Sequence, residues 1–151
     1  MTGRRDQREF RMNYLASQIL LQRNDPGEAE TVIRMNLEGL REQPAKKREG
    51  GFLRLLGEFQ FRRGEMDNAI NSLKDAIRFL EEVENPRQLW QGNDSLASGL
   101  GDHKRMSDAR GHWRAAANVI QNTANSLSDR ALRVGFLEAS AIREILSKSE
   151  I

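Results

Sequence analysis

A repeat with a period of about 40 residues constrains the fold of this chain more than any other feature of its sequence. Apolar and small residues recur in three successive copies in one ungapped register, which is the signature of a repeat architecture. The recurring sets are Ala29, Ala69 and Ala109; Ile33, Leu73 and Trp113; Leu37, Ile77 and Ala117; and Leu40, Leu80 and Ile120. We therefore expect one supersecondary unit to occur three times, because each copy can bury its apolar face only against a neighbour.

Each copy has the periodicity of helices. In the second copy, one apolar helical face is formed by Ala69, Leu73, Ala76, Ile77 and Leu80. The chain has no alternating run of β-branched residues and no Asn-Gly or Asp-Gly hairpin, so strands are not expected. The sequence predicts an all-α fold. The expected helices cover residues 6–23, 27–42, 47–63, 66–83, 87–101, 107–126 and 129–147.

Two glycines interrupt the second copy. A glycine inside a helix costs about 1 kcal/mol relative to alanine, so each one needs a structural reason. Gly57 is predicted to let the first helix of the pair approach the second closely. Gly64 is predicted to end the first helix in the left-handed conformation. The other copies have different residues at this turn, namely Arg23 or Asn24 in the first and His103 or Lys104 in the third.

These residues resemble a known repeat family. The set Leu56-Gly57, Gly64, Ala69, Leu73 and Ala76 is similar to the tetratricopeptide (TPR) pattern. The period found here exceeds the usual TPR length of about 34 and overlaps that of HEAT and armadillo repeats. The resemblance implies a TPR-like right-handed solenoid of three antiparallel helix pairs with a C-terminal capping helix. We expect a single domain over 1–151, with repeats at about 6–45, 46–85 and 86–127 and a capping segment at 128–148.

The C-terminal part also resembles a particular group of TPR proteins. Segments 116–120, 125–127, 130–133 and 136–137 are similar to the closing repeat of TPR arrays in large bacterial regulatory proteins. Such arrays follow a cyclase, kinase or ATPase module, and none of these modules occurs in this sequence. The resemblance therefore implies a small adaptor or part of a larger regulator, in which the array docks or senses a partner.

The expected last helix carries two apolar faces. One face, predicted to cap the core of the third repeat, comprises Leu132, Phe136, Ala139, Ile142 and Leu146. The opposite face comprises Val134, Leu137, Ala141 and Ile145. Either Ser140 N-caps a second short helix and so rotates the two faces, or one face is a docking or homodimer surface.

The sequence offers no catalytic set. Without cysteine the chain can have no disulfide, thiolate nucleophile or cysteine-ligated metal. His103 and His112 are too far apart to share one helix face as metal ligands. The glycine-rich run at 99–102 has no following Lys-Ser or Lys-Thr and is interpreted as a helix end. We therefore predict no enzyme activity, no cofactor and no metal. Trp113 is predicted in the core, and Trp90 either in the core or as a partner anchor.

Charge and hydropathy narrow the classes of partner. Lys and Arg total 24 against 22 for Asp and Glu, and the basic clusters at 4–11 and 46–48 lie among acidic residues rather than in a long basic stripe. The sequence therefore does not predict nucleic acid as a partner. No run of 18 apolar residues and no signal peptide is visible, so the sequence predicts a cytoplasmic protein with no membrane contact.

The resemblance to TPR proteins also implies a partner-binding surface. If the family's geometry holds, the first helix of each pair lines the concave face. The candidate partner-binding residues are then Arg11, Tyr14, Gln18, Gln22, Arg54, Glu58, Phe61, Arg62, Asp94 and Ser98. Phe61, between two arginines, is either an aromatic anchor for a bound peptide or helix or a residue that a neighbouring helix covers. The lysine and asparagine set of chaperone-binding carboxylate clamps is absent.

Two functions follow from this reasoning. The first is a non-enzymatic protein–protein interaction module, an adaptor or scaffold in signalling, that binds a partner's peptide or helix on the concave face. The alternative is a regulatory sensor that binds a small molecule or a signalling peptide in the groove.

Overall fold

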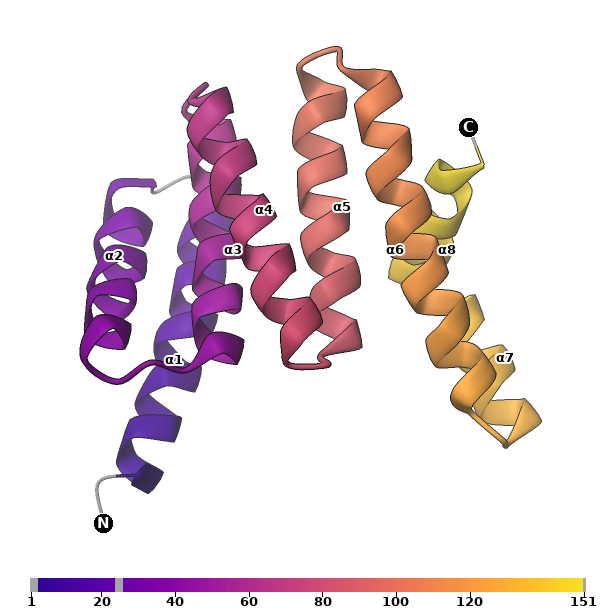
Figure 1. The fold of residues 1–151 in the computed structure, drawn as a ribbon, viewed down its shortest axis with the longest axis horizontal. Helices are drawn as coiled ribbons and strands as arrows, with labels where there is room; N and C mark the ends of the chain where they lie inside the picture. The colour runs from indigo at the N-terminus through magenta and orange to yellow at the C-terminus, as the bar shows by residue number, and fades with distance from the viewer. Residues whose placement is uncertain (1–2, 24–25, 151) are drawn as a thin grey trace. The chain divides into compact units, whose positions relative to one another are not determined.

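The fold is all-α, as the sequence predicts (Figure 1). The computed structural model describes the backbone of residues 3–23 and 26–150, and side chains from residue 7 onward with the exception of residues 24–26 and 151. Over these residues the chain forms eight helices and no strand. They are α1 (Gly3–Gln22), α2 (Pro26–Glu42), α3 (Lys46–Arg62), α4 (Met66–Glu82), α5 (Pro86–Asp102), α6 (Met106–Ser126), α7 (Arg130–Glu138) and α8 (Ser140–Ser149). None of the described helices is long and apolar enough to cross a membrane.

Helix boundaries repeat with the period of the sequence. Helices α2, α4 and α6 begin at Pro26, Met66 and Met106, which are separated by one repeat period each. Helices α3 and α5 begin at Lys46 and Pro86 with the same spacing. The predicted helices agree with these bounds to within a few residues, except at the C-terminal end of the chain.

The chain divides into two compact units, Met1–Val83 with α1–α4 and Glu84–Ile151 with α5–α8. We call them the first unit and the second unit and describe each by itself. The single domain and the right-handed solenoid expected from the sequence both remain predictions.

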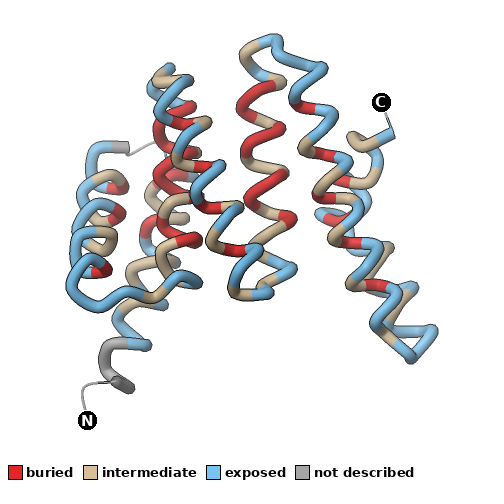
Figure 2. Tube along the Cα trace, in the orientation of Figure 1, coloured by how far each residue is buried: buried red, intermediate tan, exposed pale blue. Residues whose placement is uncertain are grey.

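In the first unit, the core lies where α3 meets the pair α1–α2 (Figure 2). The first pair contributes Leu21, Ala29, Ile33 and Leu40, and α3 contributes Phe52, Leu55, Leu56 and Phe59. Aromatic rings of α1 and α3 pack together. The centre of the Phe52 ring lies 5.8 Å from the centre of the Tyr14 ring and 6.2 Å from that of the Phe10 ring. These contacts bury one apolar face of α3.

Glycines set the close approach of α3 and α4. A Cβ atom at Gly57 would lie 2.5 Å from Leu73 Cγ, which confirms the role predicted for this glycine. A Cβ atom at Gly50 would lie 2.8 Å from Leu80 Cγ, a contact that the sequence does not predict. Both glycines are therefore required by packing rather than by backbone conformation.

The turns after α3 and α5 have the same hydrogen bonds although their residues differ. Gly64 has the predicted left-handed conformation, with φ of +77°. Lys104, at the corresponding position of the next copy, has φ of +64° without being glycine. In both turns the next amide donates to a carbonyl five residues back, from Glu65 to Gln60 and from Arg105 to Leu100. This pattern is the Schellman motif, and the third copy keeps it despite the lysine.

In the second unit, the expected last helix is divided at Ala139 into α7 and α8. Ala139 has extended dihedral angles, φ −56° and ψ 133°, and α8 begins at Ser140. Ile142 and Ile145, predicted on opposite faces, are both buried with Trp90, Ala116 and Ile120. The rotated-face interpretation is thus confirmed, although Ala139 and not Ser140 is the N-cap.

Two assignments at this end were wrong, because Leu132 and Ala139, both predicted on the face that caps the core, are exposed. Leu132, predicted to cap the core, is 65% exposed, because the break at Ala139 turns α7 away from the direction of a continuous helix. Both tryptophans are buried, so the core prediction for Trp113 and the core alternative for Trp90 are confirmed.

Candidate functional site

The residues predicted from the concave face differ widely in exposure. Arg54 and Phe61 are buried, 6% and 8% exposed, so the covered alternative holds for Phe61. Tyr14, Gln18, Glu58, Asp94 and Ser98 are half-buried, and Arg11, Gln22 and Arg62 are exposed. Whether any of these residues contacts a partner remains a prediction.

The structure brings three of them together in a network between α1 and α3. Arg54 donates from Nη1 to Glu58 Oε1 at 2.6 Å and from Nη2 to the Tyr14 hydroxyl at 2.5 Å. Burial by itself would lower the pKa of Arg54, but the charge of Glu58 and the bonds to Glu58 and Tyr14 outweigh it, so the pKa is raised. The guanidinium stays charged and is held inside the fold.

Two more of these residues use their polar atoms within their own unit. Arg62 donates from Nη1 to the carbonyl of Leu21, at the end of α1. Asp94 accepts a hydrogen bond of 3.2 Å from Trp113 Nε1, which satisfies the buried indole. Much of the hydrogen-bonding capacity on the predicted face therefore stabilises the fold.

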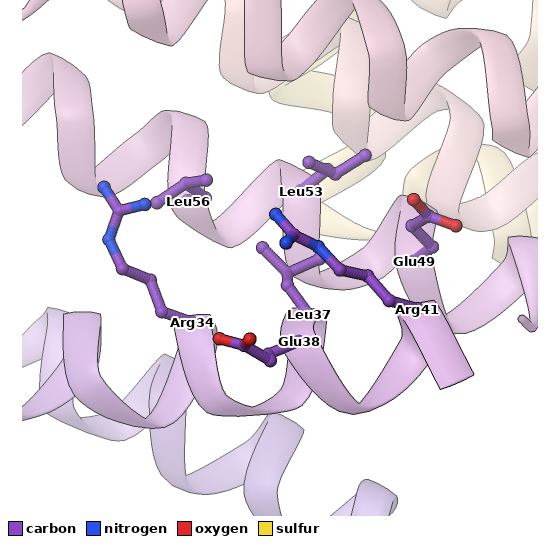
Figure 3. Close-up of a pocket in the computed structure, with 7 residues that line it drawn as sticks. All are labelled: Arg34, Leu37, Glu38, Arg41, Glu49, Leu53 and Leu56. Carbon is purple, nitrogen blue, oxygen red and sulfur yellow. The ribbon is translucent and has the colours of Figure 1, made fainter. Parts of the chain in front are cut away.

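A different surface of the first unit is open. A groove of about 330 Å³ lies between α2 and α3, and we call it the α2–α3 groove. Its lining residues are Arg34, Leu37, Glu38 and Arg41 from α2 and Glu49, Leu53 and Leu56 from α3. Within each helix these residues lie on one side, because successive turns contribute them, at positions 34, 37–38 and 41 in α2 and at positions 49, 53 and 56 in α3. Figure 3 shows the leucines between the two helices and the Arg34 guanidinium beside Leu56.

Among the described residues, most of the charged side chains around this groove have no partner. Arg34 donates from Nε to Glu30 at 2.8 Å. Arg41, Glu38 and Glu49 form no side-chain hydrogen bond or ion pair within the described residues. Sequence reasoning missed this site because it considered only the first helix of each pair. The available signal was the spacing of Arg34, Glu38 and Arg41 around Leu37.

The histidines have structural contacts. His103 Nδ1 lies 2.8 Å from the carbonyl oxygen of Gly99 at the end of α5, and His112 Nδ1 lies 3.3 Å from Asn93 Oδ1. Among the described residues no cluster of three or more His, Cys, Asp or Glu side chains is arranged to hold a metal ion.

Comparison with known proteins gives no relative from which a role can be transferred. No protein-family model matches the chain, and neither a curated protein nor a solved structure matches it. The TPR resemblance therefore rests on the quoted residues and remains a prediction.

Proposed function

We propose that this chain is a non-enzymatic protein-interaction module, an adaptor or scaffold whose α2–α3 groove binds a short helix or peptide of a partner protein. The observation that carries the proposal is one open surface that combines a leucine floor, formed by the side chains of Leu37, Leu53 and Leu56, with the charges of Glu38, Arg41 and Glu49, which pair with no side chain among the described residues. A TPR-like helical repeat is consistent with this function, because such repeats present extended surfaces to partners.

The hydrogen bonds of the arginines favour this groove over the predicted concave face, on which Arg54 and Arg62 lie. Arg54 and Arg62 already donate to groups within the first unit, so a partner would have to replace existing hydrogen bonds. In the groove, Arg41 has no such bond to lose within the described residues. A carboxylate from a partner would therefore add an interaction there, and the leucines would add buried apolar area.

Groove dimensions indicate the kind of segment that fits. Arg34 and Arg41 are separated by two helical turns, which span about 10 Å. A partner helix of two to three turns can place apolar side chains over the leucine floor and a carboxylate beside Arg41. A volume of 330 Å³ is near the lower limit for small-molecule pockets, and four charged side chains line it, so a peptide suits it better than a small molecule.

Affinity capture from the native cells, with the full chain as bait, tests this proposal. Arg41→Glu reverses a charge at the groove, and Arg110→Glu makes the same change on an exposed part of α6 as a matched control. We expect Arg41→Glu to lose a bound protein that wild type and Arg110→Glu both retain. A third bait, Arg11→Glu, reports on the predicted concave face.

Equal recovery of the same proteins by wild type and Arg41→Glu would show that the groove is not the binding site. If Arg11→Glu is the only variant that fails to capture the partner, the partner binds the predicted concave face instead. A third outcome is that no bait captures a protein, but a synthetic small ligand or a metabolite mixture shifts the melting temperature of the chain. The function is then that of a regulatory sensor and not of a protein-interaction module.

A further inference from the structure

Helix α1 has an apolar stripe on its exposed side. Met12, Leu15 and Ile19 are 69%, 52% and 47% exposed, and we call these three residues the α1 stripe. Arg8 lies four residues before Met12, and Arg23 lies four residues after Ile19, so both arginines fall on the same helix face. Both are exposed, and neither forms an ion pair or hydrogen bond from its side chain within the described residues. Within the described residues, the stripe therefore has a cation at each end that pairs with no other side chain.

The same pattern occurs one repeat period later in α3. Arg48, Phe52, Leu55, Phe59 and Arg63 stand at the corresponding positions. There the three apolar residues are each only 1% exposed. The third copy has Gly92, Ser95 and Gly99 instead, so the pattern belongs to the first two copies and is not a general property of the repeat.

The contacts around α3 show what covers such a stripe. Phe52, Leu55 and Phe59 belong to the core cluster formed with the helix pair α1–α2. At one end, the guanidinium of Arg48 lies 4.3 Å from the centre of the Phe10 ring of α1.

At the other end, Arg63 Nη1 is 3.3 Å from Glu30 Oε2 of α2. A covered stripe thus meets apolar side chains along its length, an aromatic ring at its first arginine and a carboxylate at its second.

We propose that the α1 stripe docks a helix pair of a partner protein in the way that α3 docks α1–α2. The partner pair places an aromatic ring against Arg8, a carboxylate against Arg23 and apolar side chains over the stripe. This surface is separate from the α2–α3 groove, and the two proposals do not depend on each other.

Charge argues against a second copy of this chain as the occupant. Two α1 stripes facing each other would bring Arg8 of one copy near Arg23 of the other, or the two Arg8 residues together, and like charges repel. The last helix pair of a second copy does not fit either. There Trp90, the counterpart of Phe10, already contacts Phe136 at 5.6 Å, and Arg110 stands at the position of Glu30.

The repeat period supplies a probe for this surface. We would place a second copy of residues 7–46 directly before residue 7 of the full chain, which keeps the repeat register and provides the proposed occupant in the same molecule. Because the chain has no cysteine, Leu15→Cys gives a single thiol in the α1 stripe. Its rate of reaction with a maleimide reports whether the stripe is covered.

We expect the thiol to react at least about tenfold more slowly in the extended chain than in the original chain, because covered sites react only after local opening. Lys74→Cys, at an exposed position of α4, should react equally fast in the extended and the original chain. Glu30→Lys in the added copy should restore part of the reactivity, since it places a lysine beside Arg23. Equal rates for the Leu15→Cys thiol in the two chains would overturn the proposal.

Two measurements on the unextended chain identify other occupants. Sedimentation as a dimer that Leu15→Glu converts to monomer would assign the stripe to a second copy. Co-sedimentation with vesicles of equal parts phosphatidylcholine and phosphatidylserine, lost with Leu15→Glu, would assign it to a membrane surface. Either result overturns the partner helix pair, and a monomer that leaves the vesicles unbound supports it. The capture experiment with Arg41→Glu tests the α2–α3 groove, and the thiol experiment tests the α1 stripe. Either proposal can therefore be overturned without the other.

Discussion

Arg54 shows how neighbouring residues determine what a charged side chain does. Its register places it on the predicted partner-facing surface, yet it is 6% exposed and bonded to Tyr14 and Glu58. A buried cation is tolerated only when it is paired and hydrogen-bonded, and Tyr14 supplies one of the two acceptors. The hydroxyl of Tyr14 therefore stabilises the fold through Arg54.

Removing this hydroxyl tests that role. Tyr14→Phe keeps the ring against Phe52 and removes the acceptor of Arg54 Nη2. We expect the free energy of unfolding to fall by about 1.5–3 kcal/mol, the range for hydrogen bonds to charged groups, as measured by urea denaturation. Ser126→Ala removes an exposed hydroxyl and should change it by less than about 0.5 kcal/mol. A Tyr14→Phe chain as stable as wild type would contradict the assignment.

Lys104 offers a second test at the residue scale. A left-handed conformation costs a non-glycine residue about 1–2 kcal/mol, and glycine avoids this cost but loses more entropy on folding. We expect Lys104→Gly to raise the free energy of unfolding by about 0.5–1 kcal/mol and Gly64→Ala to lower it by about 1 kcal/mol. Both changes in the free energy of unfolding are measured by urea denaturation, from the shift of the midpoint. A stabilising Gly64→Ala would show that the turn does not require positive φ.

At the scale of helices, the spacing of α3 and α4 depends on the absence of a side chain at position 57. We expect Gly57→Ala to destabilise the protein by about 1–3 kcal/mol through overpacking against Leu73, even though alanine favours the helix by about 1 kcal/mol. Gly111→Ala in α6 is the matched control, because a Cβ atom there meets nothing within 4 Å. It should stabilise the protein by about 1 kcal/mol.

Thermal denaturation of the two variants separates these effects. If both alanines raise the melting temperature, the close approach of α3 to α4 is not limited by Gly57. If both alanines lower the melting temperature, the effect of Gly111→Ala is not explained by the higher helix propensity of alanine.

For the molecule as a whole, the helix pair α5–α6 is covered by α8, whereas the α1 stripe of the first unit is exposed. Ending the chain after Glu138 removes Ile142 and Ile145 and uncovers Trp90 and Ile120. We expect a loss of about 1.5–3 kcal/mol for each isoleucine and an increase in self-association.

Sedimentation velocity and binding of a hydrophobic dye measure this change. A chain that ends after Leu146 keeps both isoleucines and should remain close to wild type in both measurements. Equal behaviour of the two shortened chains would show that α8 does not cover the core of the second unit.

The sequence by itself determined the helices, their period and several turns. The register of Ala69 and Leu73 and the turn at Gly64 depend on residues close in the chain, so local periodicity and glycine chemistry are enough to predict them. The last helix also shows two apolar faces in the sequence, but periodicity leaves open whether the helix divides or one face docks a partner.

Tertiary structure alone decided which of these faces and charges remain accessible. The buried charge of Arg54 is compensated by Tyr14, in the preceding repeat, which accepts one of its hydrogen bonds, and Gly50 is needed because Leu80 lies against it. The α2–α3 groove and the uncovered α1 stripe likewise depend on which helices become neighbours. Periodicity shows which side chains share a face, but exposure depends on residues far away in the chain that pack against that face.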